Sequence, residues 1–228
     1  MVIAKATKST PLASESERVL LKERAYQELK RLIQSSVFPP HVALSERQLS
    51  DRLRMSKTPI RAALENLETQ GLVTVSPQRG IFVRELSARE IGELFDVRMA
   101  VEPFAAAKLS QRAWSPTQRT QLKKNLTKQR SAAKAEDPLA ATTLDIEFHR
   151  LLVEILDNRE MMTWLEKCFD KLHRSVLHIN RLVPGRLQKS YEDHVAIAKS
   201  ITDGDGSQST TLMQEHLKYG RRFLLDQY

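Results

Sequence analysis

The chain has 228 residues, of which 41% are hydrophobic and 28% are charged, a balance typical of folded proteins rather than disordered ones. No apolar run approaches the roughly 20 residues of a membrane-spanning helix, and the first residues lack the apolar core of a signal peptide. The single cysteine, Cys168, excludes an intrachain disulfide. We therefore expect a cytoplasmic protein without membrane contact. The formal net charge is +8, and residues 1–86 hold 14 Lys/Arg against 9 Asp/Glu, which is the expected direction if this shorter part meets phosphates.

Residues 1–17 are predicted to form a flexible tail, and helical periodicity follows them. Apolar residues at three- and four-residue spacing predict a first helix from about residue 18 to 35, which the prolines of "VFPPHVAL" end. Ser45 and Gln48 form a capping box that predicts the start of a short second helix. The stretch "TPIRAALENLETQ" predicts a third helix, with Gly71 as its left-handed cap.

A β-hairpin is predicted next, because the short runs "LVTV" and "GIFV" are joined by "SPQR". Two helices, a short turn, a third helix and a hairpin make up a winged helix-turn-helix, here over residues 18–86. In such a fold the later helix of the pair enters the major groove of DNA, and the earlier one braces against the backbone.

Residues on these helices and at the hairpin tip are the candidate DNA contacts: Arg47, Lys57, Thr58, Arg61, Arg79 and Gly80. Lys57, Thr58 and Arg61 begin the third helix, the end that enters the groove in such folds. Arg52 and Arg54 also lie on or after the second helix, but a solvated helix face explains them equally well.

Residues 87–228 show about six or seven helical segments and no strand, which predicts an all-α bundle. Two capping boxes, at Ser87 with Glu90 and at Ser115 with Gln118, mark helix starts within it. The predicted fold is therefore mainly α, with an N-terminal winged helix-turn-helix of three helices plus a hairpin wing and a C-terminal helical bundle.

The stretch "TLDIEFHRLL" sets Asp145 and His149 four positions apart, on one face of a helix. By itself this window favours an ordinary amphipathic helix with polar edges. However, His194 and His216 lie near the apolar positions of two later helices, and three helices of a bundle can bring such residues to one point. Three imidazoles and one carboxylate suit zinc, nickel, manganese, iron or cobalt.

The segment "LSERQLSDRLRMSKTPIRAALENLETQGLV", followed by "QRGIFV", resembles the DNA-binding domain of the GntR family of bacterial transcription regulators. The resemblance implies DNA contacts by Arg47, Lys57, Thr58, Arg61 and Gly80. Lys57 stands where arginine is commoner in that family. Because lysine cannot form the same bidentate pair with guanine, base readout there is expected to be looser.

Residues 87–228, including "LFDVRMAVEPFAA", resemble the FCD-type effector domain of the FadR subfamily of these regulators. In that family an aspartate and three histidines bind a divalent metal, which implies Asp145, His149, His194 and His216 as ligands here. A small organic acid could complete the coordination of the metal with its carboxylate.

Three further residues are candidates for binding such an effector: Arg98, Arg174 and Asn180. Arg98 resembles the family's arginine in the "D-V-R" segment, and we assign it as a second anchor for an anionic effector. An intramolecular pair with Glu102, four positions later, explains Arg98 equally well.

These features predict a transcription regulator, expected to be a repressor, that binds a palindromic operator in double-stranded DNA as a homodimer. Its bundle, residues 87–228, would provide dimerisation and bind the small carboxylate effector at a divalent metal, with zinc as the first choice. One alternative is the same DNA-binding regulator with a purely structural metal. Another is a metal-dependent hydrolase, but no motif assigns a general acid or base, so we expect no enzyme.

Overall fold

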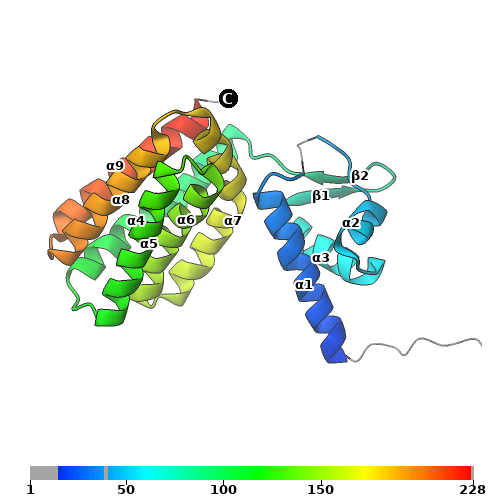
Figure 1. Cartoon of the computed structure of the whole chain (residues 1–228), viewed down its shortest axis with the longest axis horizontal. Coiled ribbons are helices and arrows are strands. Elements are labelled where there is room, and N and C mark those ends of the chain that lie inside the picture. Colours follow the sequence, from blue (N-terminus) through cyan, green and yellow to red (C-terminus); the bar gives the residue numbers. More distant parts are fainter. Residues whose placement is uncertain (1–14, 39–40, 227–228) are drawn as a thin grey trace, which may run out of the picture. The chain divides into compact units, whose positions relative to one another are not determined.

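The structure, a computed structural model, describes residues 15–38 and 41–226 (Figure 1). The contacts within the chain separate it into two units, with the main division between Val83 and Arg84. Residues 1–14 of the predicted tail lie outside the described residues, and the limits of the tail and of the two domains, at 17 and 86, remain predictions.

The first unit is the predicted winged helix-turn-helix. Its elements are α1 (Glu15–Gln34), α2 (Glu46–Leu53), α3 (Lys57–Thr69), β1 (Val73–Ser76) and β2 (Gly80–Val83). The first helix begins before the predicted start at residue 18, and the acidic Glu15 suits the positive end of the helix dipole. Buried apolar residues that recur on α1 and α3 form its core, including Leu29, Ile60 and Leu67.

Local capping signals set the ends of the two helices that follow α1. The backbone N–H of Gln48 donates to the Ser45 hydroxyl over 3.2 Å, and the Gln48 side chain accepts from the backbone of Ser45 at 2.8 Å. After α3, Gly71 has a φ of +73°, and the N–H of Leu72 closes the helix by donating to the carbonyl of Leu67. Both predicted signals are confirmed.

The wing is an antiparallel hairpin whose register runs from Val73 opposite Val83 to Ser76 opposite Gly80. Leu44, just before α2, forms an additional bridge with Ile81, with two backbone hydrogen bonds of 2.8 Å. Gly80 lies beside this bridge with a φ of +111°, and a Cβ atom there would lie 2.9 Å from the carbonyl oxygen of Leu44. Glycine is therefore required where the wing joins the segment before α2.

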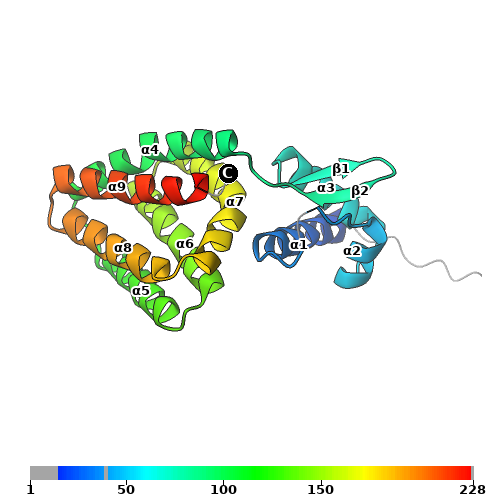
Figure 2. The ribbon, with the colours of Figure 1, turned by 90° about the horizontal axis from the view of Figure 1, so that it is seen from above.

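The second unit is the predicted all-α bundle. Its described helices are α4 (Ala88–Ser110), α5 (Pro116–Lys134), α6 (Pro138–Leu156), α7 (Arg159–Leu182), α8 (Arg186–Thr202) and α9 (Gly206–Leu225). Helix α4 lies along α9, while α6 packs against both α5 and α7 (Figure 2). Among the described residues, no helix has the length and apolar character that crossing a bilayer requires.

The interior of this bundle is not purely apolar. Three phenylalanines, Phe95, Phe148 and Phe169, are at most 2% exposed and belong to α4, α6 and α7. Charged and polar side chains are buried with them, including Arg98, Glu102, Gln129, His149 and His194. Because such groups are rarely buried without partners, this part of the core is where a functional site is expected.

We predict that Gly80→Ala lowers the free energy of unfolding by about 3 kcal/mol, because the unfavourable φ costs about 1–2 kcal/mol and the clash with Leu44 adds to it. Urea unfolding followed by circular dichroism measures the change. Gly185→Ala is the matched control, since Gly185 also has a positive φ but no atom within 4 Å of an added Cβ, and it should cost only about 1 kcal/mol. Equal losses in the two variants would show that the contact with Leu44 is unimportant.

Candidate functional site

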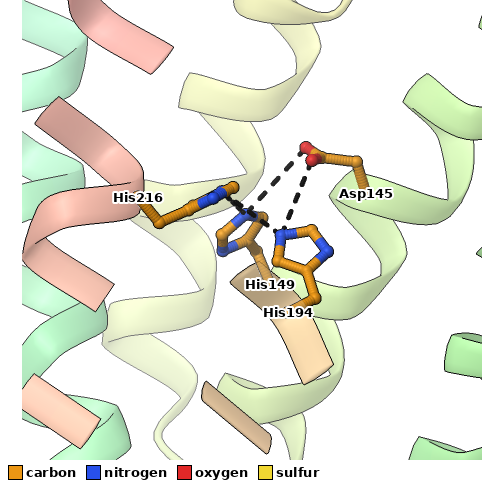
Figure 3. Close-up of side chains that lie close together, drawn as sticks. All are labelled: Asp145, His149, His194 and His216. Carbon is orange, nitrogen blue, oxygen red and sulfur yellow. Dashed lines mark hydrogen bonds and ion pairs between the residues drawn. The ribbon is translucent and has the colours of Figure 1, made fainter. Parts of the chain in front are cut away.

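Three helices of the bundle bring one carboxylate and three imidazoles together. Asp145 and His149 come from α6, His194 from α8 and His216 from α9. Their side chains turn toward one another (Figure 3), and one potential ligand atom from each lies within 4.8 Å of all the others. The three histidines are buried, with His194 at 0% exposure. The four residues singled out from the sequence therefore lie at one place.

The spacing of the ligand atoms fits coordination to a single ion. The Nε2 atom of His216 lies 3.2 Å from the Nε2 atoms of both His149 and His194. The carboxylate oxygens of Asp145 lie 3.6 Å from His194 Nε2 and 3.9 Å from His149 Nε2. Two nitrogens that are each about 2.1 Å from one metal ion are separated by about 3.0–3.4 Å at octahedral or tetrahedral angles.

Each of the three histidines has a side-chain oxygen close to its Nδ1 atom. Nδ1 of His194 lies 2.8 Å from Oε1 of Gln129, and Nδ1 of His216 lies 3.4 Å from Oδ2 of Asp193. Nδ1 of His149 lies 2.5 Å from Oε2 of Glu102. Oxygen atoms in these positions favour the tautomer that carries its proton on Nδ1. In that tautomer each Nε2 directs a lone pair at the centre, as in histidines that bind metals.

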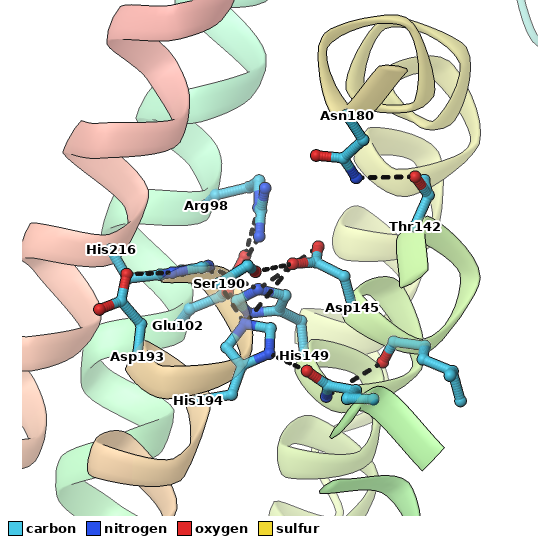
Figure 4. A network of polar contacts seen from close by, with 12 residues as sticks. Arg98, Glu102, Thr142, Asp145, His149, Asn180, Ser190, Asp193, His194 and His216 are labelled. Carbon is cyan, nitrogen blue, oxygen red and sulfur yellow. Dashed lines mark hydrogen bonds and ion pairs between the residues drawn. The ribbon is translucent and has the colours of Figure 1, made fainter. Parts of the chain in front are cut away.

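The carboxylate of Asp145 is oriented from α8, where the Ser190 hydroxyl donates to its Oδ1 over 2.8 Å (Figure 4). The centre thus combines three nitrogen lone pairs with an anionic oxygen. Lone pairs that face one another repel, whereas a divalent cation would satisfy all of them. Imidazole and carboxylate are ligands that such ions accept, so the donor set fits a metal ion.

The electrostatics of the site favour its ligand-competent protonation state. Burial lowers the pKa of His194 well below its ordinary value, and burial also lowers the pKa of His216. Burial alone would raise the pKa of Asp145, but the neighbouring histidines and Arg98 reverse this effect and lower it. At neutral pH, His194 and His216 are therefore neutral and Asp145 is ionised, as metal ligands must be.

Glu102 connects this centre to Arg98. The Nε atom of Arg98 donates to Oε1 of Glu102 over 2.6 Å, and both residues are almost fully buried on α4. Although burial opposes ionisation, the charges of Arg98 and His149 lower the pKa of Glu102 to about 2. The pair between Arg98 and Glu102, one of the two alternatives for Arg98, is thus present, and a role in effector binding stays a prediction.

The other two effector candidates lie on α7 with different surroundings. Asn180 donates to the hydroxyl of Thr142 over 2.8 Å, and Thr142 precedes Asp145 on α6 (Figure 4). Arg174 is half-buried, with its Nη2 atom 3.8 Å from the carboxylate of Glu85. Asn180 thus reaches the helix that carries two of the metal candidates, whereas the ion pair of Arg174 is with the segment before α4.

Sequence reasoning missed the residues that orient the ligands: Gln129, Ser190 and Asp193. Asp193 adjoins His194 in the sequence, yet its side chain faces His216 on the next helix. Gln129 is four residues after Asn125 on α5, and its amide donates to Asn125 over 2.6 Å, which turns its oxygen toward His194. Such contacts depend on the packing of helices and leave no spacing signal along the chain.

In the first unit, the candidate DNA contacts are at the surface. Lys57 and Thr58 are exposed in the first turn of α3, and Arg79 is exposed in the hairpin loop. Arg47 on α2 is 86% exposed, 3.8 Å from Asp51. Arg61 contacts both carboxylate oxygens of Glu46 through its Nε atom at 2.9 Å. The five side chains are accessible to a ligand of the first unit, while Gly80 has the structural role described above.

Comparison with known proteins gives consistent results for both units. Residues 93–219 match the profile of the FCD domain, and residues 21–83 match that of bacterial regulatory proteins, gntR family. The chain is 27% identical over 197 residues to the HTH-type transcriptional repressor RspR of Escherichia coli (strain K12), covering 86% of this chain and 85% of that protein.

Two further relatives extend this picture. The gluconate operon transcriptional repressor of Bacillus licheniformis is 28% identical over 166 residues, which cover 73% of this chain and 66% of that protein. The solved structure of E. coli McbR/YncC shares the fold, with a TM-score of 0.80 and 20% identity over 91% of this chain and 98% of that one.

We predict that Glu102→Gln lowers the free energy of unfolding of the metal-free protein by about 3–5 kcal/mol, because it leaves the buried charge of Arg98 without its counter-ion. Urea unfolding in the presence of a chelator measures this change. Glu93→Gln on the same helix is the matched control, since Glu93 pairs with Arg89 at the surface, and it should cost less than about 1 kcal/mol. A similarly small loss for Glu102→Gln would contradict its role as the counter-ion.

Proposed function

Because the chain belongs to the GntR family of bacterial regulatory proteins and carries an FCD domain, we propose that it is a cytoplasmic transcription repressor controlled by a small organic acid. The acid would bind at a divalent metal held by Asp145, His149, His194 and His216. The convergence of these four side chains in the core of the bundle is the observation that carries the metal-dependent part of this proposal.

Binding to double-stranded DNA is supported by the family and by the exposed start of α3. In a winged helix-turn-helix this end of the helix enters the major groove, and Lys57, Thr58 and Arg61 occupy it here. The basic excess of residues 1–86 favours contact with phosphates. We propose a homodimer on a palindromic operator, with one wing domain at each half-site.

The donor set supports a divalent transition metal. Three imidazoles and a carboxylate fit zinc as the first choice, and they also accept nickel, manganese, iron or cobalt. An ion with five or six ligands has positions left beyond the four side chains, and a carboxylate of an effector would fill them. Among the further candidates for binding the effector, Arg98 is the best supported, because its charge acts on Asp145. Arg174 and Asn180 are secondary candidates.

Control of DNA binding requires the effector to have unequal affinity for two arrangements of the protein. Helix α4 carries Arg98 and Glu102, and it begins only a few residues after the wing strand β2. We propose that changes at the metal are passed to α4 through the contact between His149 and Glu102. We propose that binding of the ligand relieves repression.

A purely structural metal is the second candidate, and the burial of the three histidines supports it. In that case the ion would hold α6, α8 and α9 together without sensing a ligand. A hydrolase is excluded as a proposal, since the relatives are transcriptional regulators, which are not enzymes.

We predict that Arg61→Ala weakens operator binding by about 1–3 kcal/mol, because it removes a contact to a base or phosphate at the start of α3. Fluorescence anisotropy with a labelled duplex from the DNA upstream of the gene, at fixed salt, measures the affinity. Arg89→Ala is the matched control: it removes an exposed arginine that also pairs with a glutamate, but on α4. If that duplex is bound no more tightly than a scrambled one, the repressor proposal is wrong.

We predict that dialysed protein binds one zinc ion per chain, that His216→Ala abolishes this binding, and that Asp193→Ala weakens it by about 10–100-fold by releasing the His216 ring. Competition with a chromophoric chelator measures the affinity. His178→Ala, which removes an exposed histidine of α7, should have no effect. Unfolding of the bundle by chelation, together with operator affinity that no acid changes, would support the structural metal instead.

A further inference from the structure

Arg186 is a buried cation that the proposed metal centre does not use. It is the first residue of α8 and follows Gly185, whose φ is +75°. Only 7% of Arg186 is exposed. Its guanidinium lies over two aromatic rings of α9, 5.3 Å from the centre of the Tyr219 ring and 5.5 Å from that of Phe223. These rings fix the side chain but cannot neutralise its charge.

The hydrogen bonding of Arg186 is incomplete. Its Nε atom is buried and has no hydrogen-bond partner among the described residues. The Tyr219 side chain hydrogen-bonds to the guanidinium, and the charges of Asp145 and Asp193 act on it, but neither carboxylate forms an ion pair with it in the described part of the chain. Buried arginine donors are normally paired with a carboxylate or a phosphate, so Arg186 has an unused capacity for an anion.

The start of α8 adds to this positive environment. Gly185 provides no side chain to accept from the first N–H groups of the helix, and the first turn contains no acidic residue. The N-terminus of a helix attracts anions, and a cation there is unfavourable. The position of Arg186 is therefore electrostatically costly in the protein alone, and a bound anion would compensate for that cost.

A small pocket borders one of the metal candidates and one of the two rings beneath Arg186. It lies between α8 and α9, has a volume of about 160 Å³, and is lined by Lys189, Asp193, Leu212, Glu215, His216 and Tyr219. His216 belongs to the proposed ligand set, and Tyr219 lies under the guanidinium of Arg186. A pocket of this size accommodates an acid of a few carbon atoms, and its lining residue Tyr219 is one of the rings that contact Arg186.

The charges of these groups define the class of ligand. Glu102 pairs with Arg98, and Asp193 pairs with Lys189 and His216, so Asp145 is the one carboxylate among the proposed ligands of the divalent ion. The ion therefore keeps a positive charge, and Arg186 adds another. A monocarboxylate would balance only one of these two positions, whereas a dicarboxylate would balance both.

We propose that Arg186 binds the second carboxylate of a short dicarboxylic acid whose first carboxylate binds at the metal centre. This inference rests on the proposed function, because it assumes that the effector is an acid held at the metal. Arg186 would make the protein bind acids with two carboxylates more tightly than acids with one.

The test compares acids of equal length on the full-length protein loaded with zinc. Isothermal titration calorimetry measures the binding of malonate, succinate and glutarate against propionate, butyrate and pentanoate. We expect at least one dicarboxylate to bind roughly tenfold more tightly than its monocarboxylate. Arg186→Gln should abolish this preference while still binding one zinc ion, and Arg186→Lys should keep part of it, since lysine retains the charge but not the planar fork.

Arg222→Gln is the matched control, because Arg222 lies over the same two rings, 5.7 Å from each, but at an exposed position. It should leave the preference unchanged. The thermal midpoint of the ligand-free protein provides a second measurement. Arg186→Gln should leave it unchanged or raise it, because the substitution removes an uncompensated buried charge.

Two results would overturn the inference: a wild-type protein without preference for any dicarboxylate, or an Arg186→Gln variant that keeps the preference and loses thermal stability. In the second case Arg186 is a structural cation stacked on the rings. Failure of the wild-type protein to bind zinc would instead contradict the proposed function. The same titrations on the metal-free protein then decide whether Arg186 discriminates between the acids.

Discussion

The bundle depends on one electrostatic constraint, the convergence of three imidazole lone pairs and a carboxylate inside an apolar core. The Nε2 atom of His216 lies 3.2 Å from those of His149 and His194, and with protons on the Nδ1 atoms the lone pairs of these nitrogens repel one another. Oxygen atoms of Glu102, Gln129 and Asp193 face the Nδ1 atoms of the three rings, which favours the tautomer with its proton on Nδ1. The protein thus uses its folding free energy to hold together groups that a cation would stabilise, which is typical of a preorganised binding site.

This centre connects most of the bundle. The candidate ligands belong to α6, α8 and α9, and the groups that orient them come from α4, α5 and α8. A change in coordination would therefore alter contacts on five helices at once, and α4 is the one that follows the wing in the chain. Buried polar networks of this kind have few alternative arrangements, because each unsatisfied group is costly. Such a network suits a protein with two discrete states better than a gradual response.

Much of the architecture could be predicted because its signals are local. The capping box at Ser45 and the glycine at position 71 mark helix ends within a few residues, and helical periodicity identifies the buried faces. The metal candidates could also be found, since Asp145 and His149 share a helix face. Contacts between helices could not, because the partners of Gln129 and Arg186 are set by packing at long sequence separation. Arg186 looks like an ordinary exposed residue at the start of a helix, and only its burial distinguishes it.

The contact between Arg61 and Glu46 has a consequence for how DNA would be read. Both contacts with the carboxylate use Nε of the arginine, while bidentate recognition of guanine requires two nitrogens of the guanidinium. Glu46 can therefore restrain the rotamer of Arg61 before DNA arrives, which lowers the conformational entropy lost on association. Its negative charge would at the same time repel the phosphate backbone. The pair would thus favour a base edge over a phosphate as the partner of Arg61. The protein would then spend less time bound to DNA of random sequence.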